Sequence, residues 1–133
     1  ILCAAVADYR PSVTADKKIK REKTGEMTLT LVPNPDIAAA LGKIKRENQV
    51  NVGFALETND EATNAKDKCA RKNFDFIVMN SLKDKGAGFQ VDTNKITIFT
   101  AGGDVMEYPL KTKKEVAADI VDAVVEIAKK KGL

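Results

Sequence analysis

Short apolar runs, separated by stretches with helical spacing, constrain the fold of this chain most strongly. Residues 1–7 read ILCAAVA and residues 74–79 read FDFIVM. Neither run shows the regular alternation of a strand with one face in water, so we predict two strands that are covered on both faces. Helices are expected between the strands. This order predicts an α/β fold, namely a three-layer Rossmann-like domain with a largely parallel sheet and an antiparallel hairpin extension.

Local patterns predict the remaining elements. Gly102 and Gly103 indicate a hairpin turn, because glycine accepts the positive φ angles of such turns. Thr112 and Glu115 have the spacing of a capping box, which places a helix start there. The expected strands are residues 27–32, 50–57, 95–100 and 104–108, and the expected helices are residues 35–47, residues 60–72 with Asn59 or Asp60 as cap, and residues 112–131.

The length of 133 residues suffices for one hydrophobic core, so we expect a single domain over residues 1–133. Because the sequence begins inside a predicted strand, we also expect it to be a piece of a longer protein. No apolar run approaches the roughly 20 residues that span a bilayer, and ILCAAVA lacks the basic flank of a signal peptide. Cys3 and Cys69 have no metal or redox spacing and are expected to be small core residues. These features predict a cytoplasmic protein with no membrane partner.

The sequence contains no histidine. This absence excludes Ser-His-Asp and Cys-His nucleophile systems, imidazole general bases and histidine-containing metal sites. Any chemistry must therefore use lysine, arginine, carboxylates, asparagine or backbone groups. The net charge of +3 is small, and the few aromatic residues are not interleaved with basic ones. Nucleic acid is accordingly not an expected partner.

Three polar segments fall where an α/β sheet binds ligands, at the carboxyl ends of strands or the amino ends of the following helices. They are Asp8, Asn34–Ile37, and Phe54 with Glu57–Asn59. Two of these segments have a purely structural alternative. Asp8 fits an Asx-turn after a strand, and Asn34 fits the cap of a helix. The residues alone leave both alternatives open.

Two groups of basic residues indicate a phosphate site. Lys68 and Lys72 are four residues apart, so on a helix both ammonium groups reach one polyanion such as a triphosphate. The alternative is that they only complement the negative end of the helix. Residues 14–26 form a basic loop that fits either a lid over phosphates, a solvated stretch or a patch for other polyanions. The residues therefore indicate a nucleotide-phosphate site without naming the base or the reaction.

Nearly the whole chain is covered by six motifs in a specific order. They read AAVADYRP, KIKR, NPDI, VGFALET, KDKCARKN with FDFIVMN, and GFQVDTN. In this order and approximate spacing they resemble phosphopantothenoylcysteine synthetase, which in most bacteria is the C-terminal half of a bifunctional coenzyme A biosynthesis flavoprotein. The NPDI and KxxxK elements resemble the CTP-using bacterial branch of that family rather than the ATP-using eukaryotic branch.

The resemblance implies a two-step ligation. CTP activates the carboxylate of 4'-phosphopantothenate as an acyl-cytidylate, and the amine of L-cysteine then displaces CMP. Magnesium is expected to accompany the triphosphate, and the sequence identifies no metal ligands. FMN is expected only in a fused decarboxylase domain outside this chain, through which higher assembly is conceivable. The family is dimeric, and we expect residues 88–108 to contribute to pairing.

The resemblance also implies roles for individual residues. Lys18 belongs to a flap over the site and acts mainly in the amide-forming step. The nucleotide is contacted by Asp8 and the backbone of Ala4, and Phe54 packs on it. Lys68 and Lys72 hold the phosphates. The pocket for cytosine and its sugar consists of Asn34, Pro35, Asp36 and Ile37.

Some features depart from the family's pattern. Tyr9 stands where tryptophan is common, Leu56 replaces a small residue, and Arg21 stands where lysine is frequent. The Gly-rich phosphate loop, the Ser-rich region and the asparagine of the first step are absent from the sequence. An alternative function is therefore a non-catalytic nucleotide-binding and dimerisation fragment, which needs that N-terminal half of the domain for activity.

Overall fold

The computed structural model describes residues 1–20, 25–57, 60–81 and 91–133. The chain divides into two compact units. The larger unit comprises Ile1–Cys3 and Ile37–Leu133, and the smaller comprises Ala4–Asp36. Each unit has strand pairings of its own. The expectation of one domain over residues 1–133 stays a prediction.

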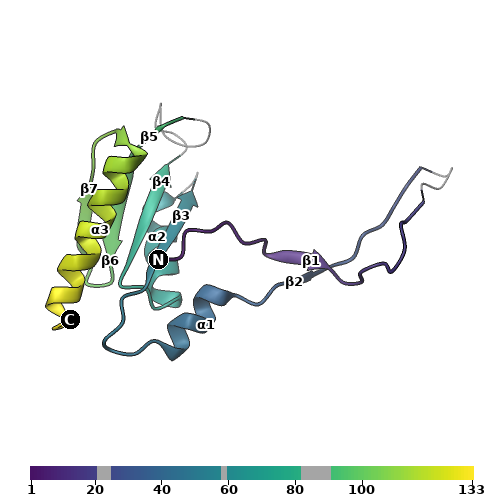
Figure 1. Cartoon of the computed structure of the whole chain (residues 1–133), viewed down its shortest axis with the longest axis horizontal. Coiled ribbons are helices and arrows are strands. Elements are labelled where there is room, and N and C mark those ends of the chain that lie inside the picture. The colour runs from purple at the N-terminus through teal and green to yellow at the C-terminus, as the bar shows by residue number, and fades with distance from the viewer. Residues whose placement is uncertain (21–24, 58–59, 82–90) are drawn as a thin grey trace. The chain divides into compact units, whose positions relative to one another are not determined.

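The larger unit contains a four-stranded mixed sheet with the order β3-β4-β6-β7 (Figure 1). β3 and β4 are parallel, and the other two pairings are antiparallel. The α/β class and the antiparallel hairpin are therefore confirmed. The elements are α1 (Ile37–Ile44), β3 (Val52–Glu57), α2 (Glu61–Arg71), β4 (Phe76–Ser81), β5 (Thr93–Asn94), β6 (Ile96–Thr100), β7 (Val105–Glu107), β8 (Lys111–Thr112) and α3 (Lys113–Lys130).

Alternate residues of β4 face two separate apolar layers. Phe76 and Val78 pack in one core cluster with side chains of α3. Ile77 and Met79 pack in a second cluster with Ala65 and other residues of α2. Because successive side chains of a strand point to opposite faces, this arrangement places one helix on each side of the sheet. The three-layer order of the prediction is thus present around β4.

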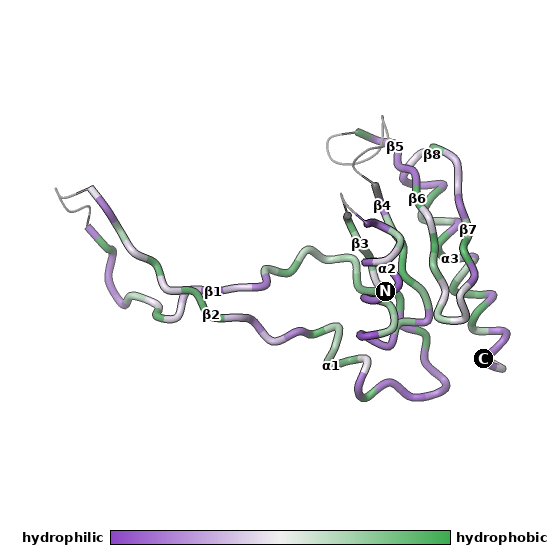
Figure 2. Tube along the Cα trace, turned by 180° about the vertical axis from the view of Figure 1, so that it is seen from behind, coloured by the Kyte–Doolittle hydropathy of each residue, from purple (hydrophilic) through white to green (hydrophobic). Residues whose placement is uncertain are grey.

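The predicted strand over residues 1–7 is wrong. Leu2 alone forms a parallel bridge, opposite Gly53, and its N–H donates to the Val52 carbonyl at 2.8 Å. Val6 is 58% exposed, and Cys3 is exposed rather than in the core. In the described part of the chain no strand pairs with this segment on its other side, so its apolar residues, whose trace is coloured green in Figure 2, have no second layer to cover them.

The predicted strand over residues 27–32 is displaced along the chain. The observed strand, β2 (Leu31–Pro33), pairs antiparallel with β1 (Tyr9–Pro11) in the smaller unit. Met27 and Leu29 lie before it and are 68% and 56% exposed. The alternation of residues 27–32 indicated one buried face, but a two-stranded ribbon within this unit supplies no layer to bury it.

Helix starts were predicted with mixed success. The capping box of α3 is confirmed, because Thr112 Oγ1 accepts from the Glu115 N–H and a Glu115 carboxylate oxygen accepts from the Thr112 N–H. The Thr112 hydroxyl also donates to the Glu115 carboxylate at 2.6 Å, and this bond, together with the bond from the Thr112 N–H, lowers the pKa of Glu115. Asp60 precedes α2 in a left-handed conformation without a side-chain cap. α1 begins at Ile37, two residues later than residue 35.

α1 packs closely against the end of α2. A Cβ atom at Gly42 would overlap the carbonyl of Lys72, so only glycine fits at this point of the helix. Asn73, with a φ of 51°, donates from Nδ2 to the Gly42 carbonyl at 2.9 Å. Asn73, two residues after the end of α2, therefore joins α2 to α1.

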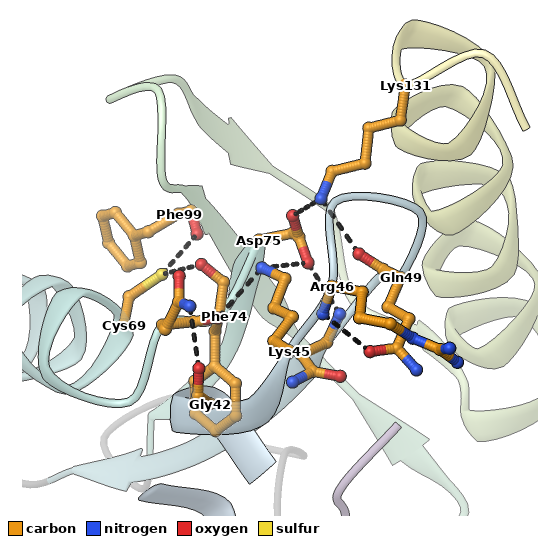
Figure 3. A network of polar contacts seen from close by, with 11 residues as sticks. Gly42, Lys45, Arg46, Gln49, Cys69, Phe74, Asp75, Phe99 and Lys131 are labelled. Atoms are coloured by element: carbon orange, nitrogen blue, oxygen red, sulfur yellow. Dashed lines mark hydrogen bonds and ion pairs between the residues drawn. The ribbon is translucent and has the colours of Figure 1, made fainter.

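A buried carboxylate joins three elements at the amino ends of β3 and β4 (Figure 3). Asp75 accepts from Lys45 Nζ at 2.8 Å, from Lys131 Nζ at 2.6 Å and from the Asn51 N–H at 2.6 Å. The side chains of Lys45 and Asp75 are only 8% and 9% exposed. Burial acts to raise the pKa of Asp75, but the hydrogen bonds from Lys131, Lys45 and Asn51 outweigh it and hold the pKa below its ordinary value.

This depressed pKa makes acid stability depend on Asp75. Above the ordinary carboxyl pKa of about 3.9 the ion pairs stabilise the fold fully, and this contribution is lost as pH falls through the lower pKa of the folded state. We expect Asp75→Asn to lower the free energy of unfolding at pH 7 by about 3–5 kcal/mol, because Lys45 stays buried without its counterion. Urea unfolding at a series of pH values should also show a shallower loss below pH ~5 than in the unmodified protein.

Asp119→Asn is the matched control. Asp119 pairs with Lys111 at 2.8 Å, but those side chains are 19% and 31% exposed. Asp119→Asn should therefore lower the free energy of unfolding less than Asp75→Asn does. Equal losses in the two variants, or an unchanged acid dependence in Asp75→Asn, would contradict the role given to Asp75.

Candidate functional site

Two of the predicted site residues meet at the outer strand of the parallel pair. Lys68 on α2 donates from Nζ to the carbonyl oxygen of Phe54 on β3 at 3.0 Å. Both side chains are partly buried, and the Phe54 ring packs against the α3-side core. This bond directs the Lys68 side chain toward β3. An ammonium group carries three N–H donors, so two donors of Lys68 remain for other acceptors.

Lys72 lies one turn beyond Lys68. It directly follows α2, and its N–H donates to the Lys68 carbonyl at 3.1 Å. Lys72 is thus the C-cap residue of α2, and the expectation that both ammonium groups reach one polyanion stays a prediction. The last turn of α2 does carry basic residues, as the alternative reading required. However, the Lys68 ammonium is directed at β3 rather than at the helix carbonyls.

Asn34 organises the smaller unit and does not cap α1. Its Nδ2 donates to the Ala7 carbonyl at 2.7 Å, and its N–H donates to the Asp8 carbonyl at 2.8 Å. Its Oδ1 accepts from the Arg10 guanidinium at 3.0 Å. The capping alternative is wrong for Asn34, because its side chain already holds the chain on either side of Asp8. Sequence reasoning missed Arg10, although it lies within the AAVADYRP motif.

The other predicted residues are divided between the two units. In the smaller unit, Ala4, Asp8 and Lys18 are exposed and lie outside β1 and β2, and Asn34 is joined by the exposed Pro35 and Asp36. Ile37 begins α1 in the larger unit and is 52% exposed. Thr58, Asn59, Arg21 and Lys23 lie outside the described residues.

Asn80, a polar residue that directly follows the predicted buried strand of residues 74–79, lies near the carboxyl end of β4. The Oδ1 atom of Asn80 is buried and finds no hydrogen-bond partner in the part of the chain that the structure describes. In the sheet register Asn80 is opposite Leu56, which is 42% exposed at the end of β3. The sequence signal for this residue was a polar side chain directly after a continuous apolar strand.

The Cys69 thiol is held inside the fold. Cys69 is buried, as predicted, and its thiol lies 3.5 Å from the Phe74 carbonyl. Burial, followed by the charge of Asp75, raises the pKa of this thiol, which disfavours the nucleophilic thiolate. Residues 1–20, 25–57, 60–81 and 91–133 contain no group of three or more Cys, Asp or Glu residues placed to hold a metal ion. None of the helices described is long and apolar enough to cross a membrane.

Comparison with known proteins gives consistent matches over nearly the whole chain. Residues 1–128 match the family model of the DNA/pantothenate metabolism flavoprotein C-terminal domain. One relative is a protein named cysteine/cysteine sulfinic acid decarboxylase, from an unknown prokaryotic organism. The chain is 58% identical to it over 127 residues, which cover 96% of this chain and 35% of that protein. It is 43% identical over 132 residues to the coenzyme A biosynthesis bifunctional protein CoaBC of Bacillus subtilis (strain 168), covering 99% and 32%.

A solved structure also matches. The crystal structure of the C-terminal domain of coenzyme A biosynthesis bifunctional protein CoaBC aligns with a TM-score of 0.73 at 32% identity, covering 96% of this chain and 53% of that one. The chain thus spans about a third of the length of the curated relatives and about half of the solved domain.

Proposed function

Because the chain belongs to the family of DNA/pantothenate metabolism flavoprotein C-terminal domains, we propose that it forms the nucleotide side of a ligase in coenzyme A biosynthesis. This ligase joins 4'-phosphopantothenate to L-cysteine at the expense of CTP. The observation that carries the proposal is the bond between Lys68 and the Phe54 carbonyl, which directs a cation to the outer strand of the parallel pair. In open α/β sheets, ligands bind near the carboxyl ends of such strands.

The proposed reaction has two steps. A carboxylate oxygen of 4'-phosphopantothenate attacks the α-phosphorus of CTP, and pyrophosphate leaves with the electron pair of the broken P–O bond. The amine of cysteine then attacks the acyl carbon, CMP leaves, and the amine gives up a proton. The acyl-cytidylate is already activated, so no histidine or other enzymic nucleophile is needed. Catalysis then depends on positioning and on stabilising the charge of the leaving groups.

Lys68 and Lys72 are proposed to bind the phosphates. The two remaining Lys68 donors are available for phosphate oxygens, and Lys72 follows it by one turn. Asn34, Pro35, Asp36 and Ile37 are proposed to read cytosine and its sugar. Asp8 and the backbone of Ala4 are proposed to contact the nucleotide. Two structural facts support this set. Asn34 is hydrogen-bonded to Ala7 and Asp8, and residues 34–36 lead directly into α1.

The proposal also includes magnesium, a homodimer and a fused decarboxylase domain. Magnesium is expected to arrive with CTP, and because the described residues supply no carboxylate or thiol cluster for it, we assign it no protein ligands. A homodimer is proposed, with residues 88–108 contributing; β7 forms an outer strand of the four-stranded sheet within that range. FMN and further assembly belong to a fused decarboxylase domain. The runner-up function is a nucleotide-binding and dimerising fragment without turnover.

Nucleotide binding tests the phosphate roles. In calorimetry with the full-length protein, we expect Lys68→Met to weaken CTP binding about tenfold and CMP binding much less, since CMP lacks the β- and γ-phosphates. Lys66→Met is the matched control, because Lys66 lies on the same helix with its ammonium 5.5 Å from the centre of the Phe99 ring. Equal losses for CTP and CMP, or equal effects of the two variants, would argue against phosphate binding by Lys68.

Product analysis tests the second step. Lys18 is exposed in the smaller unit, and we expect Lys18→Gln to release pyrophosphate from CTP while forming little amide, so that acyl-cytidylate accumulates. Rapid quenching with mass analysis detects that intermediate. Lys17→Gln serves as the neighbouring control and should form amide normally. A Lys18→Gln protein that makes no intermediate would refute the flap role, and a wild-type chain of these 133 residues that turns over alone would refute the fragment alternative.

A further inference from the structure

Asn80 has a buried hydrogen-bond acceptor that the described part of the chain leaves unpaired. Its Oδ1 atom accepts no hydrogen bond from the described residues, although it is shielded from solvent. Buried polar atoms are nearly always paired, because an unpaired acceptor has lost its hydration without compensation. An unpaired amide oxygen therefore requires a reason other than stability.

The neighbours of Asn80 explain why the fold offers no donor. In the sheet register its partners are Leu56 on β3 and Ile96 on β6, both apolar. Alternation along β4 places Asn80 on the same face as Phe76 and Val78, which belong to the α3-side core. An apolar side chain of similar size would continue that pattern, so packing alone does not account for an asparagine at this position.

The position of Asn80 favours a ligand as the missing partner. It is the next-to-last residue of β4, close to the carboxyl end of the parallel pair. Leu56 beside it is 42% exposed, so this end of the two strands is open to solvent. Phe54, which receives the Lys68 ammonium, is two residues earlier on β3. Asn80 is thus one strand away from β3, with its side chain on the α3 side of the sheet, whereas Lys68 approaches β3 from α2 on the other side.

We propose that Asn80 Oδ1 accepts a hydrogen bond from a neutral N–H or O–H group of a bound substrate. This proposal rests on the ligase function above. An amide oxygen carries partial negative charge and repels phosphate and carboxylate groups, so the partner is not one of the anionic groups that lysines bind. Suitable donors are the amide and hydroxyl groups of 4'-phosphopantothenate, or the amino and ribose hydroxyl groups of CTP. Asn80 is a binding residue in this scheme and takes no proton.

The test compares Asn80→Leu with Asn80→Asp in the full-length protein. Calorimetry with CTP alone and with 4'-phosphopantothenate alone separates the two sources of the donor. We expect Asn80→Leu to raise the Kd of one of the two about tenfold, because the donor of the bound substrate loses its acceptor. Asn80→Asp, which keeps an acceptor oxygen, should bind that substrate more tightly than Asn80→Leu does.

Thermal unfolding without ligand distinguishes this role from a structural one. Because the wild-type oxygen is unpaired, Asn80→Leu should leave the Tm unchanged or raise it. Asn94→Leu is the matched control: Asn94 Oδ1 accepts from the Lys95 N–H at 3.0 Å, so that substitution should lower the Tm and leave both Kd values unchanged.

The outcomes separate this proposal from the proposed function. An Asn80→Leu protein with unchanged Kd for both substrates, or one with a lowered Tm and unchanged Kd, overturns the role of Asn80 and leaves the ligase standing. A wild-type protein that binds a substrate but forms no amide overturns the ligase, and the comparison of Kd values still decides Asn80. A wild-type protein that binds neither CTP nor 4'-phosphopantothenate overturns both.

Discussion

The Asp75 carboxylate is the interaction on which the larger unit depends. It binds Lys45 just beyond α1, Lys131 just beyond α3 and the backbone before β3. The Asp75 backbone continues the network, because its N–H donates to Asn51 and its carbonyl accepts from Ala101 at the hairpin turn. Helices on opposite faces of the sheet are thereby joined through one buried group. Removing it would leave buried lysine charge without compensation, which is why the cluster acts as one structural unit.

This network occupies one end of the sheet, and the ligand site proposed above lies toward the other end. Asn51 and Asp75 precede β3 and β4, whereas Leu56 and Asn80 lie near the carboxyl ends of the same strands. At the amino ends the charged groups are paired with one another. Toward the carboxyl ends, a lysine is directed at the outer strand and an amide oxygen is unpaired among the described residues.

Local patterns in the sequence predicted much of the fold. Contacts between residues that are distant in the sequence could not be predicted in this way. The capping box at Thr112 and the buried strand before Asn80 follow from spacing within a few residues, and both are present. The Asp75 network joins residues 45, 75 and 131, and no periodicity in the sequence indicates which lysine meets which carboxylate. The prediction of a buried strand over residues 1–7 was wrong because an apolar segment is buried only where other elements cover it, and here only Leu2 forms a bridge to the sheet. For the candidate site, motif spacing found Lys68, while the role of Asn34 needed the pairing of β1 with β2.

The central claim is that CTP binds at the end of the sheet opposite to Asp75. An NMR titration of the isotope-labelled protein with CTP tests this most directly, because each backbone amide reports its own surroundings. The account predicts that the largest shift changes fall on Phe54, Lys68 and their neighbours, that the amides of Asn51 and Asp75 stay nearly unchanged, and that ATP at the same concentration produces smaller changes. Shift changes centred on Asn51 and Asp75, or equal responses to the two nucleotides, would contradict it.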